Sequence, residues 1–263
     1  MTRLNDFFAD RDHKALVTFI TAGDPIPEVT VPALHAIVAA GADVLELGIP
    51  FSDPEAEGPA IQASSERALA NGVTLSQVLS MVREFRETNQ STPVVLMGYL
   101  NSILAMPDFP SRAGEAGVDG LIMVNLPPEE AQILRKDLHS NQIDLIFLVA
   151  PTTTTQRREW IFSQAQGFVY YVSLKGPTGT GQVNVTEVAD KLGDMRRQTD
   201  LPLCVGFGIK DGQTAGLIGA HADGVVVGSA LVNLMGQGGS TEQICERLTQ
   251  AVVDLRQGLD HPA

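Results

Sequence analysis

The sequence has few of the features that mark secreted or membrane-spanning proteins. Only two of its 263 residues are cysteines, Cys204 and Cys245, which argues against a disulfide framework and fits a reducing compartment. Its longest apolar runs fall short of the roughly 20 residues that a membrane helix needs. Residues 1–14 are polar and mixed in charge, unlike a signal peptide. We therefore expect a cytoplasmic protein that does not bind membranes.

Positive charge is also scarce in this chain. The 18 Lys and Arg residues are outnumbered by 31 Asp and Glu residues, which gives a formal net charge of −13. Such an excess of negative charge argues against nucleic acid and anionic lipid surfaces as partners. A phosphorylated small molecule stays open as a substrate, because backbone amides can bind phosphate without Lys or Arg.

What the sequence does contain is a regular alternation of short apolar runs and amphipathic stretches. Continuous apolar runs are typical of parallel strands that are covered on both faces. Eight strand–helix units predict an α/β fold: one (β/α)8 TIM-barrel domain over residues 1–263, with an extra N-terminal helix. An open doubly wound sheet is the alternative, but no Gly-x-Gly-x-x-Gly follows the first run. The runs are 15–22, 44–49, 94–99, 120–124, 145–150, 168–173, 203–207 and 224–227, and residues 127–130 and 184–187 carry helix start signals.

Glycines stand at the ends of the last two predicted strands, at Gly206, Gly208 and Gly228. Barrels often bind phosphate with the loops after strands 7 and 8 and the N-terminus of a short extra helix. Glycine lets the backbone approach a phosphate, and Ser229 can add a hydroxyl group. These residues predict a phosphate site with a short helix after strand 8, although glycines also simply make turns. The Gly-rich residues 176–181 predict either a mobile loop over a ligand or an ordinary long turn.

One carboxylate interrupts the second apolar run. Glu46 stands between Leu45 and Leu47. Burying a lone acid in a strand costs free energy unless the acid is paired with another group or serves in the protein's chemistry. It precedes a loop, near the carboxyl end of the strand, where α/β folds place their active sites. We therefore predict a catalytic carboxylate, with a satisfied core acid or a strand-end cap as the alternative.

An ordered set of motifs along nearly the whole chain resembles the tryptophan synthase α-subunit family. The motifs occupy residues 19–25, 41–43, 45–54, 58–62, 97–101, 126–130, 170–179, 206–209 and 228–230, and the block from Glu46 to Pro54 is highly specific. The resemblance implies a TIM barrel that cleaves indole-3-glycerol phosphate to indole and glyceraldehyde 3-phosphate in tryptophan biosynthesis. It implies no metal or organic cofactor in this subunit. It also implies a partner, a β subunit that holds pyridoxal phosphate and receives indole within an αββα complex.

The resemblance also implies roles for individual residues. Glu46 matches the family's general acid and base, and Glu57 stands where a second carboxylate steadies the indole N–H. Asp53 and Pro54 match the loop that communicates with the β subunit, with a plain turn as the alternative for Asp53. The residues that match substrate-binding positions are Phe19, Tyr170, Thr178, Gly179, Phe207, Gly208, Gly228 and Ser229, with Tyr99 as a further candidate for the pocket wall.

Three positions depart from the family's pattern. Glu57 replaces an Asp, and its extra methylene moves the carboxylate by about 1.5 Å, a displacement that catalytic geometry tolerates poorly. We therefore expect Glu57 to work poorly or to need a rearranged loop. Asn125 also replaces an Asp, where we expect a structural role beside the site. Glu55 replaces an apolar residue, and both glutamates could instead be solvated.

Three other functions stay open at this point. A catalytically weakened homologue would bind ligands and act mainly as the activating partner of a β subunit. A Schiff-base aldolase would use Lys175, just past the sixth apolar run, as its nucleophile. A stand-alone lyase would release free indole.

Overall fold

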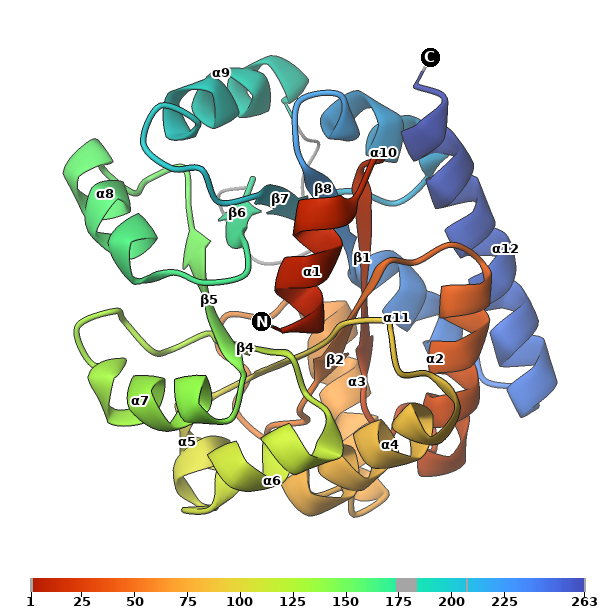
Figure 1. Cartoon of the computed structure of the whole chain (residues 1–263). Helices are drawn as coiled ribbons and strands as arrows, with labels where there is room; N and C mark the ends of the chain where they lie inside the picture. The colour runs from red at the N-terminus through yellow and green to blue at the C-terminus, as the bar shows by residue number, and fades with distance from the viewer. Residues whose placement is uncertain (1, 174–183, 207, 263) are drawn as a thin grey trace.

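The computed structural model describes residues 2–173, 184–206 and 208–262. Within them, eight parallel strands close into a barrel in sequential order, with β8 paired to β1 (Figure 1). This confirms the predicted TIM barrel and rules out the open sheet. The strands are β1 (Ala15–Thr21), β2 (Val44–Gly48), β3 (Val94–Gly98), β4 (Gly120–Met123), β5 (Asp144–Val149), β6 (Val169–Val172), β7 (Leu203–Gly206) and β8 (Gly224–Val227).

Helices surround the barrel and connect its strands. The predicted N-terminal helix is α1, and the predicted short helix after strand 8 is α11. The helices of the described residues are α1 (Arg3–Asp10), η1 (Pro27–Val29), α2 (Thr30–Ala39), α3 (Pro59–Ala70), α4 (Leu75–Thr88), α5 (Leu100–Leu104), α6 (Phe109–Ala116), α7 (Gln132–Ser140), α8 (Thr155–Gln164), α9 (Val185–Met195), α10 (Gly212–Gly219), α11 (Ser229–Gly236) and α12 (Thr241–Asp260). None of them is long and apolar enough to cross a membrane.

One predicted helix start is wrong. Residues 127–130 were expected to begin a helix, but α7 begins at Gln132. The amides of Glu130 and Ala131 instead bond back to the carbonyls of Pro127 and Pro128, three residues earlier, as in a turn. The consecutive prolines explain the delay, because proline offers no N–H and disfavours helical backbone in the residue before it. The other predicted start is confirmed, since Asn184 caps α9.

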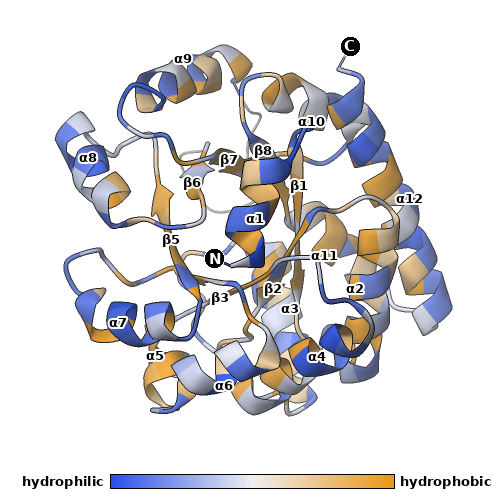
Figure 2. Cartoon of the chain, viewed as in Figure 1, coloured by the Kyte–Doolittle hydropathy of each residue, from blue (hydrophilic) through white to orange (hydrophobic). Residues whose placement is uncertain are grey.

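Alternation along the strands separates two apolar layers. Figure 2 shows that the strands are mostly hydrophobic, whereas the surrounding helices mix hydrophobic and hydrophilic residues. One buried cluster fills the barrel interior and includes Val44 of β2, Tyr170 of β6 and Leu4 of α1. Leu45 and Leu47 belong to the second cluster, between strands and helices. Because side chains two apart in a strand share a face, Glu46 points inward with Val44.

Helix α1 closes the amino-terminal end of the barrel. Its Leu4 is fully buried among the inward-facing strand residues. The neighbouring Arg3 binds Asp119 at 3.0 Å, and Asp119 also pairs with the buried Arg86 at 2.7 Å. These contacts hold α1 against the amino-terminal end of the barrel.

Candidate active site

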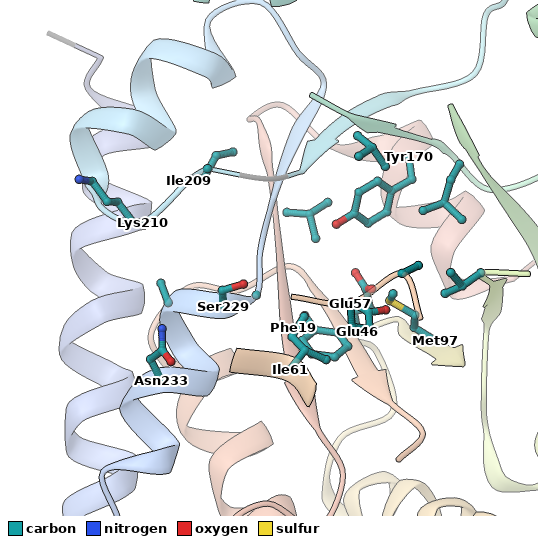
Figure 3. Close-up of a pocket in the computed structure, with 18 residues that line it drawn as sticks. Phe19, Glu46, Glu57, Ile61, Met97, Tyr170, Ile209, Lys210, Ser229 and Asn233 are labelled. Atoms are coloured by element: carbon teal, nitrogen blue, oxygen red, sulfur yellow. The ribbon is translucent and has the colours of Figure 1, made fainter. Parts of the chain in front are cut away.

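A cavity of about 400 Å³ lies at the carboxyl ends of the strands (Figure 3). Every strand, or the loop that follows it, contributes to its wall. The described lining residues are Phe19, Glu46, Ala56, Glu57, Ile61, Met97, Val124, Leu148, Tyr170, Val172, Gly208, Ile209, Lys210, Val226, Gly228, Ser229, Ala230 and Asn233. The cavity therefore brings together side chains that are up to 214 residues apart, from Phe19 to Asn233.

Glu46 is the buried acid of this cavity. Its side chain is 1% exposed, and its Oε2 atom has no hydrogen-bond partner among the described residues. Burial, and after it the charge of Glu57, raises the pKa of Glu46 to about 8. A carboxyl group in this state can both donate and accept a proton near neutral pH. The unpartnered oxygen does not fit the alternative of a satisfied core acid.

The expected position of Glu46 at the strand exit needs correction. Glu46 is the third of the five residues of β2, and Gly48 ends the strand. The side chain reaches the cavity because its inward direction, and not a loop, carries it there. A strand-end cap is therefore also excluded for this residue.

Glu57 comes from the loop between β2 and α3, and the structure places it in the same cavity. It is 5% exposed, and burial raises its pKa to about 7. Its loop is held by the hydroxyl of Tyr99, which accepts a hydrogen bond from the Ala56 amide at 3.1 Å, and by Gln62, whose Nε2 donates to the Glu57 carbonyl at 2.7 Å. Glu55 is exposed, so the expectation of a solvated acid holds for Glu55 and is wrong for Glu57.

Two neighbouring residues have supporting positions outside the described lining of this cavity. The ring of Tyr99 stacks on Phe51, with 5.0 Å between the ring centroids, behind the loop that carries Glu57. Asn125 is exposed, and its Oδ1 accepts a hydrogen bond from the Leu100 amide at 2.8 Å, at the start of α5. Tyr99 instead lines a smaller adjoining cavity, together with Phe19, Glu57 and Met97. The bonding of Asn125 fits the structural role expected for it.

The side of the cavity near α11 suits an anion. Gly208 has φ of 77°, a left-handed conformation that glycine adopts without strain. Gly228 precedes α11, and Ser229 is its first residue. The first amides of a helix have no partner within the helix and carry partial positive charge. Backbone N–H groups and the Ser229 hydroxyl are thus available to a phosphate group.

Aromatic side chains form the apolar walls, and two glycines leave room for them. A Cβ atom at Gly48 would lie 2.6 Å from the Phe19 ring, and one at Gly206 would collide with the Tyr170 hydroxyl. Phe19 packs against Ile61 and Val232. The sequence did not show that Gly48 and Gly206 leave room for the side chains of Phe19 and Tyr170.

The cavity unites most of the site residues expected from the sequence. It contains Glu46, Glu57, Phe19, Tyr170, Gly208, Gly228 and Ser229. Thr178, Gly179 and Phe207 lie outside the described residues, as do Lys175 and the Gly-rich residues 176–181. Asp53 is exposed and Pro54 half-buried, and neither belongs to the described lining of this cavity. Sequence reasoning missed Lys210 and Asn233, because lone polar residues in loops and helices carry no motif.

A closed (β/α)8 barrel with two buried carboxyl groups in its cavity defines the class of the protein, a barrel enzyme equipped for acid–base chemistry. Comparison with known proteins gives the particular family. The family model described as "Tryptophan synthase alpha chain" matches residues 7–260. The chain therefore belongs to the tryptophan synthase alpha chain family, a family of carbon–carbon lyases, as the resemblance implied.

Individual relatives agree with this membership over at least 91% of their lengths. The chain is 53% identical to the tryptophan synthase alpha chain of Alkalilimnicola ehrlichii, over 94% of this chain and 91% of the relative. It is 51% identical to that of Cupriavidus pinatubonensis, over 99% and 100% of the two chains. The crystal structure of tryptophan synthase subunit alpha from Legionella pneumophila superposes with a TM-score of 0.90 at 43% identity, covering 99% of both chains.

Proposed function

We propose that this chain cleaves indole-3-glycerol phosphate to indole and glyceraldehyde 3-phosphate, with Glu46 as general acid and base. The observation that carries the proposal is the buried Glu46 carboxyl, with its pKa raised to about 8, facing a cavity that also meets the N-terminus of α11. The cavity thus offers a proton donor and an anion site to one ligand.

Glu46 would move two protons in sequence. Its carboxyl group first protonates C3 of the indole ring, which places positive charge on the ring nitrogen. The resulting Glu46 carboxylate then takes the proton of the glycerol hydroxyl next to the ring. As that carbon becomes a carbonyl, the C–C bond breaks and its electron pair restores the aromatic ring. The chemistry is acid–base throughout, so we propose no metal or organic cofactor for this chain.

Glu57 would stabilise the intermediate of this reaction. Its carboxylate accepts a hydrogen bond from the indole N–H while positive charge develops there. Because Glu57 is 5% exposed, this interaction is weakened little by water. The side chains of Phe19, Tyr170 and Phe207 would enclose the indole and glycerol parts of the substrate. Backbone amides near Gly179, Gly208, Gly228 and Ser229 would hold the phosphate, and Thr178 would hydrogen-bond the Glu57 carboxylate.

We further propose a β subunit with pyridoxal phosphate as the partner, in an αββα complex in the cytoplasm. The family name supports a partner chain, and the free thiols of Cys204 and Cys245 fit a reducing compartment. The exposed Asp53 and the neighbouring Pro54 lie in the loop after β2, next to Glu57, where contact with a partner can reach the site.

Indole release from indole-3-glycerol phosphate, measured with and without an added β subunit, tests this proposal. We expect release by the chain alone and faster release in the complex. No release in either condition, with tight substrate binding and stimulation of the β subunit, would replace the lyase by the alternative of a ligand-binding activating partner. Equal release with and without the β subunit would indicate a stand-alone lyase.

A further inference from the structure

Charge is unevenly distributed around the cavity. Among its described lining residues, the acids are Glu46 and Glu57, and Lys210 is the one cation. Figure 3 shows Lys210 beyond Ile209, on the α11 side of the cavity and away from the two acids, with Ser229 and Asn233 below it. The cavity therefore has an acidic side and a basic side.

The backbone of Lys210 is held by a hydrogen bond, whereas its side chain is exposed to solvent. Its amide donates a hydrogen bond to the Thr214 hydroxyl at 3.1 Å, and the preceding residue, Ile209, is buried. The next residue, Asp211, caps α10. The Lys210 side chain is exposed, and its ammonium group has no hydrogen bond or ion pair with any residue that the structure describes.

A lysine at this position would reduce the electrostatic repulsion between a phosphate group and the acidic protein. A phosphate monoester carries up to two negative charges, and it would enter a protein with net charge −13 and two acids in its cavity. The amides of Gly208 and α11 contribute only partial charges. A full positive charge at the cavity rim offsets this repulsion, and an exposed lysine reorients within nanoseconds.

We propose that Lys210 binds the phosphate group of the substrate, as the charged member of the site formed by Gly208, Gly228 and Ser229. In Figure 3 the ammonium group is turned outward from the cavity, so binding requires rotation about the bonds of the side chain. This proposal rests on the proposed function for the identity of the phosphate ester. Lys210 is a binding residue, and proton transfer stays with Glu46.

Lys210→Met, Lys210→Arg and the wild type test the proposal. Lys210→Met should raise KM for indole-3-glycerol phosphate about three- to tenfold, with kcat within about twofold of the wild type. Inorganic phosphate, measured by direct titration, should bind more weakly by a similar factor, and the affinity for indole should not change. Lys210→Arg should restore most of the phosphate affinity, because it restores the charge.

Lys136→Met is the matched control, because Lys136 is also exposed and its replacement removes the same charge from α7. It should leave KM and phosphate affinity unchanged. The proposal is wrong if Lys210→Met matches this control, or if it weakens indole and phosphate binding equally. Direct titration with inorganic phosphate does not depend on turnover. It therefore tests phosphate binding by Lys210 even if the chain proves not to be a lyase.

Discussion

The carboxyl groups of Glu46 and Glu57 line one cavity, and each is almost completely buried. Burial raises both pKa values, to about 8 for Glu46 and about 7 for Glu57, and the charge of Glu57 adds to the increase at Glu46. Glu46 is therefore mostly protonated at pH 7, whereas Glu57 loses its proton more readily. This order matches the proposed division of roles, in which Glu46 donates a proton and Glu57 accepts a hydrogen bond.

The raised pKa of Glu46 predicts that this residue destabilises the fold at high pH. The folded protein holds the Glu46 proton between pH 4.5, the ordinary value, and about 8, whereas the unfolded chain releases it. Stability therefore falls as pH rises through this window. Glu46→Gln should lose less stability than the wild type between pH 5 and pH 9, by on the order of 3 kcal/mol.

Urea unfolding at several pH values measures this difference. Glu246→Gln is a suitable control, because it makes the same replacement at an exposed position on α12, outside the described lining of the cavity. Parallel pH profiles for the wild type and Glu46→Gln would show that Glu46 titrates normally in the folded protein.

We predict that the negative charge of Glu57 matters more for kcat than the length of its side chain. Glu57→Gln should lower kcat by about 100-fold, because the amide cannot balance the positive charge on the indole ring. Glu57→Asp keeps the charge and should stay within about tenfold of the wild type, since the loop already holds position 57 in the cavity. Indole release measures both variants. A gain well beyond tenfold in Glu57→Asp would show that the native glutamate limits the chemistry.

Helices α10 and α12 approach so closely that a side chain at Gly258 would meet the backbone of the neighbouring helix. A Cβ atom at Gly258 would collide with the backbone carbonyl of Gly212. Gly258→Ala should therefore destabilise the fold by about 1–3 kcal/mol. Gly193, in α9, has no atom within 4 Å of such a Cβ, and Gly193→Ala should instead stabilise by about 0.5–1 kcal/mol. Thermal unfolding of the two variants tests both predictions. Equal shifts in melting temperature would contradict the packing argument.

The sequence predicted the barrel well because its strands are buried on both faces. Continuous runs such as residues 44–49 are recognisable without any knowledge of partners, and the structure moves most strand ends by a single residue. Helix starts that depend on a capping side chain, such as Asn184 before α9, were also predictable. The start of α7 was not, because the turns at Pro127 and Pro128 compete with the helix. That residues 1–263 form a single domain stays a prediction.

The site was predicted only where the sequence carries a motif. Glu46 stands out because it interrupts an apolar run, but its unpartnered Oε2 atom emerges only once the barrel closes around it. The burial of Glu57 depends on how its loop folds against Tyr99 and Gln62, which local sequence does not encode. The proposed role of Lys210 depends on the two acids that line the same cavity, and these are more than 150 residues away in the chain.

Indole formation by Glu46→Gln, under substrate saturation, tests the central claim most directly. Substrate binding by the variant is confirmed by titration, and Glu246→Gln serves as the control. The account predicts that kcat falls by about 10²- to 10⁴-fold while substrate affinity stays close to that of the wild type, because the amide cannot give a proton to C3 or take one from the hydroxyl. A Glu46→Gln variant that binds substrate and turns over within tenfold of the wild type would contradict it.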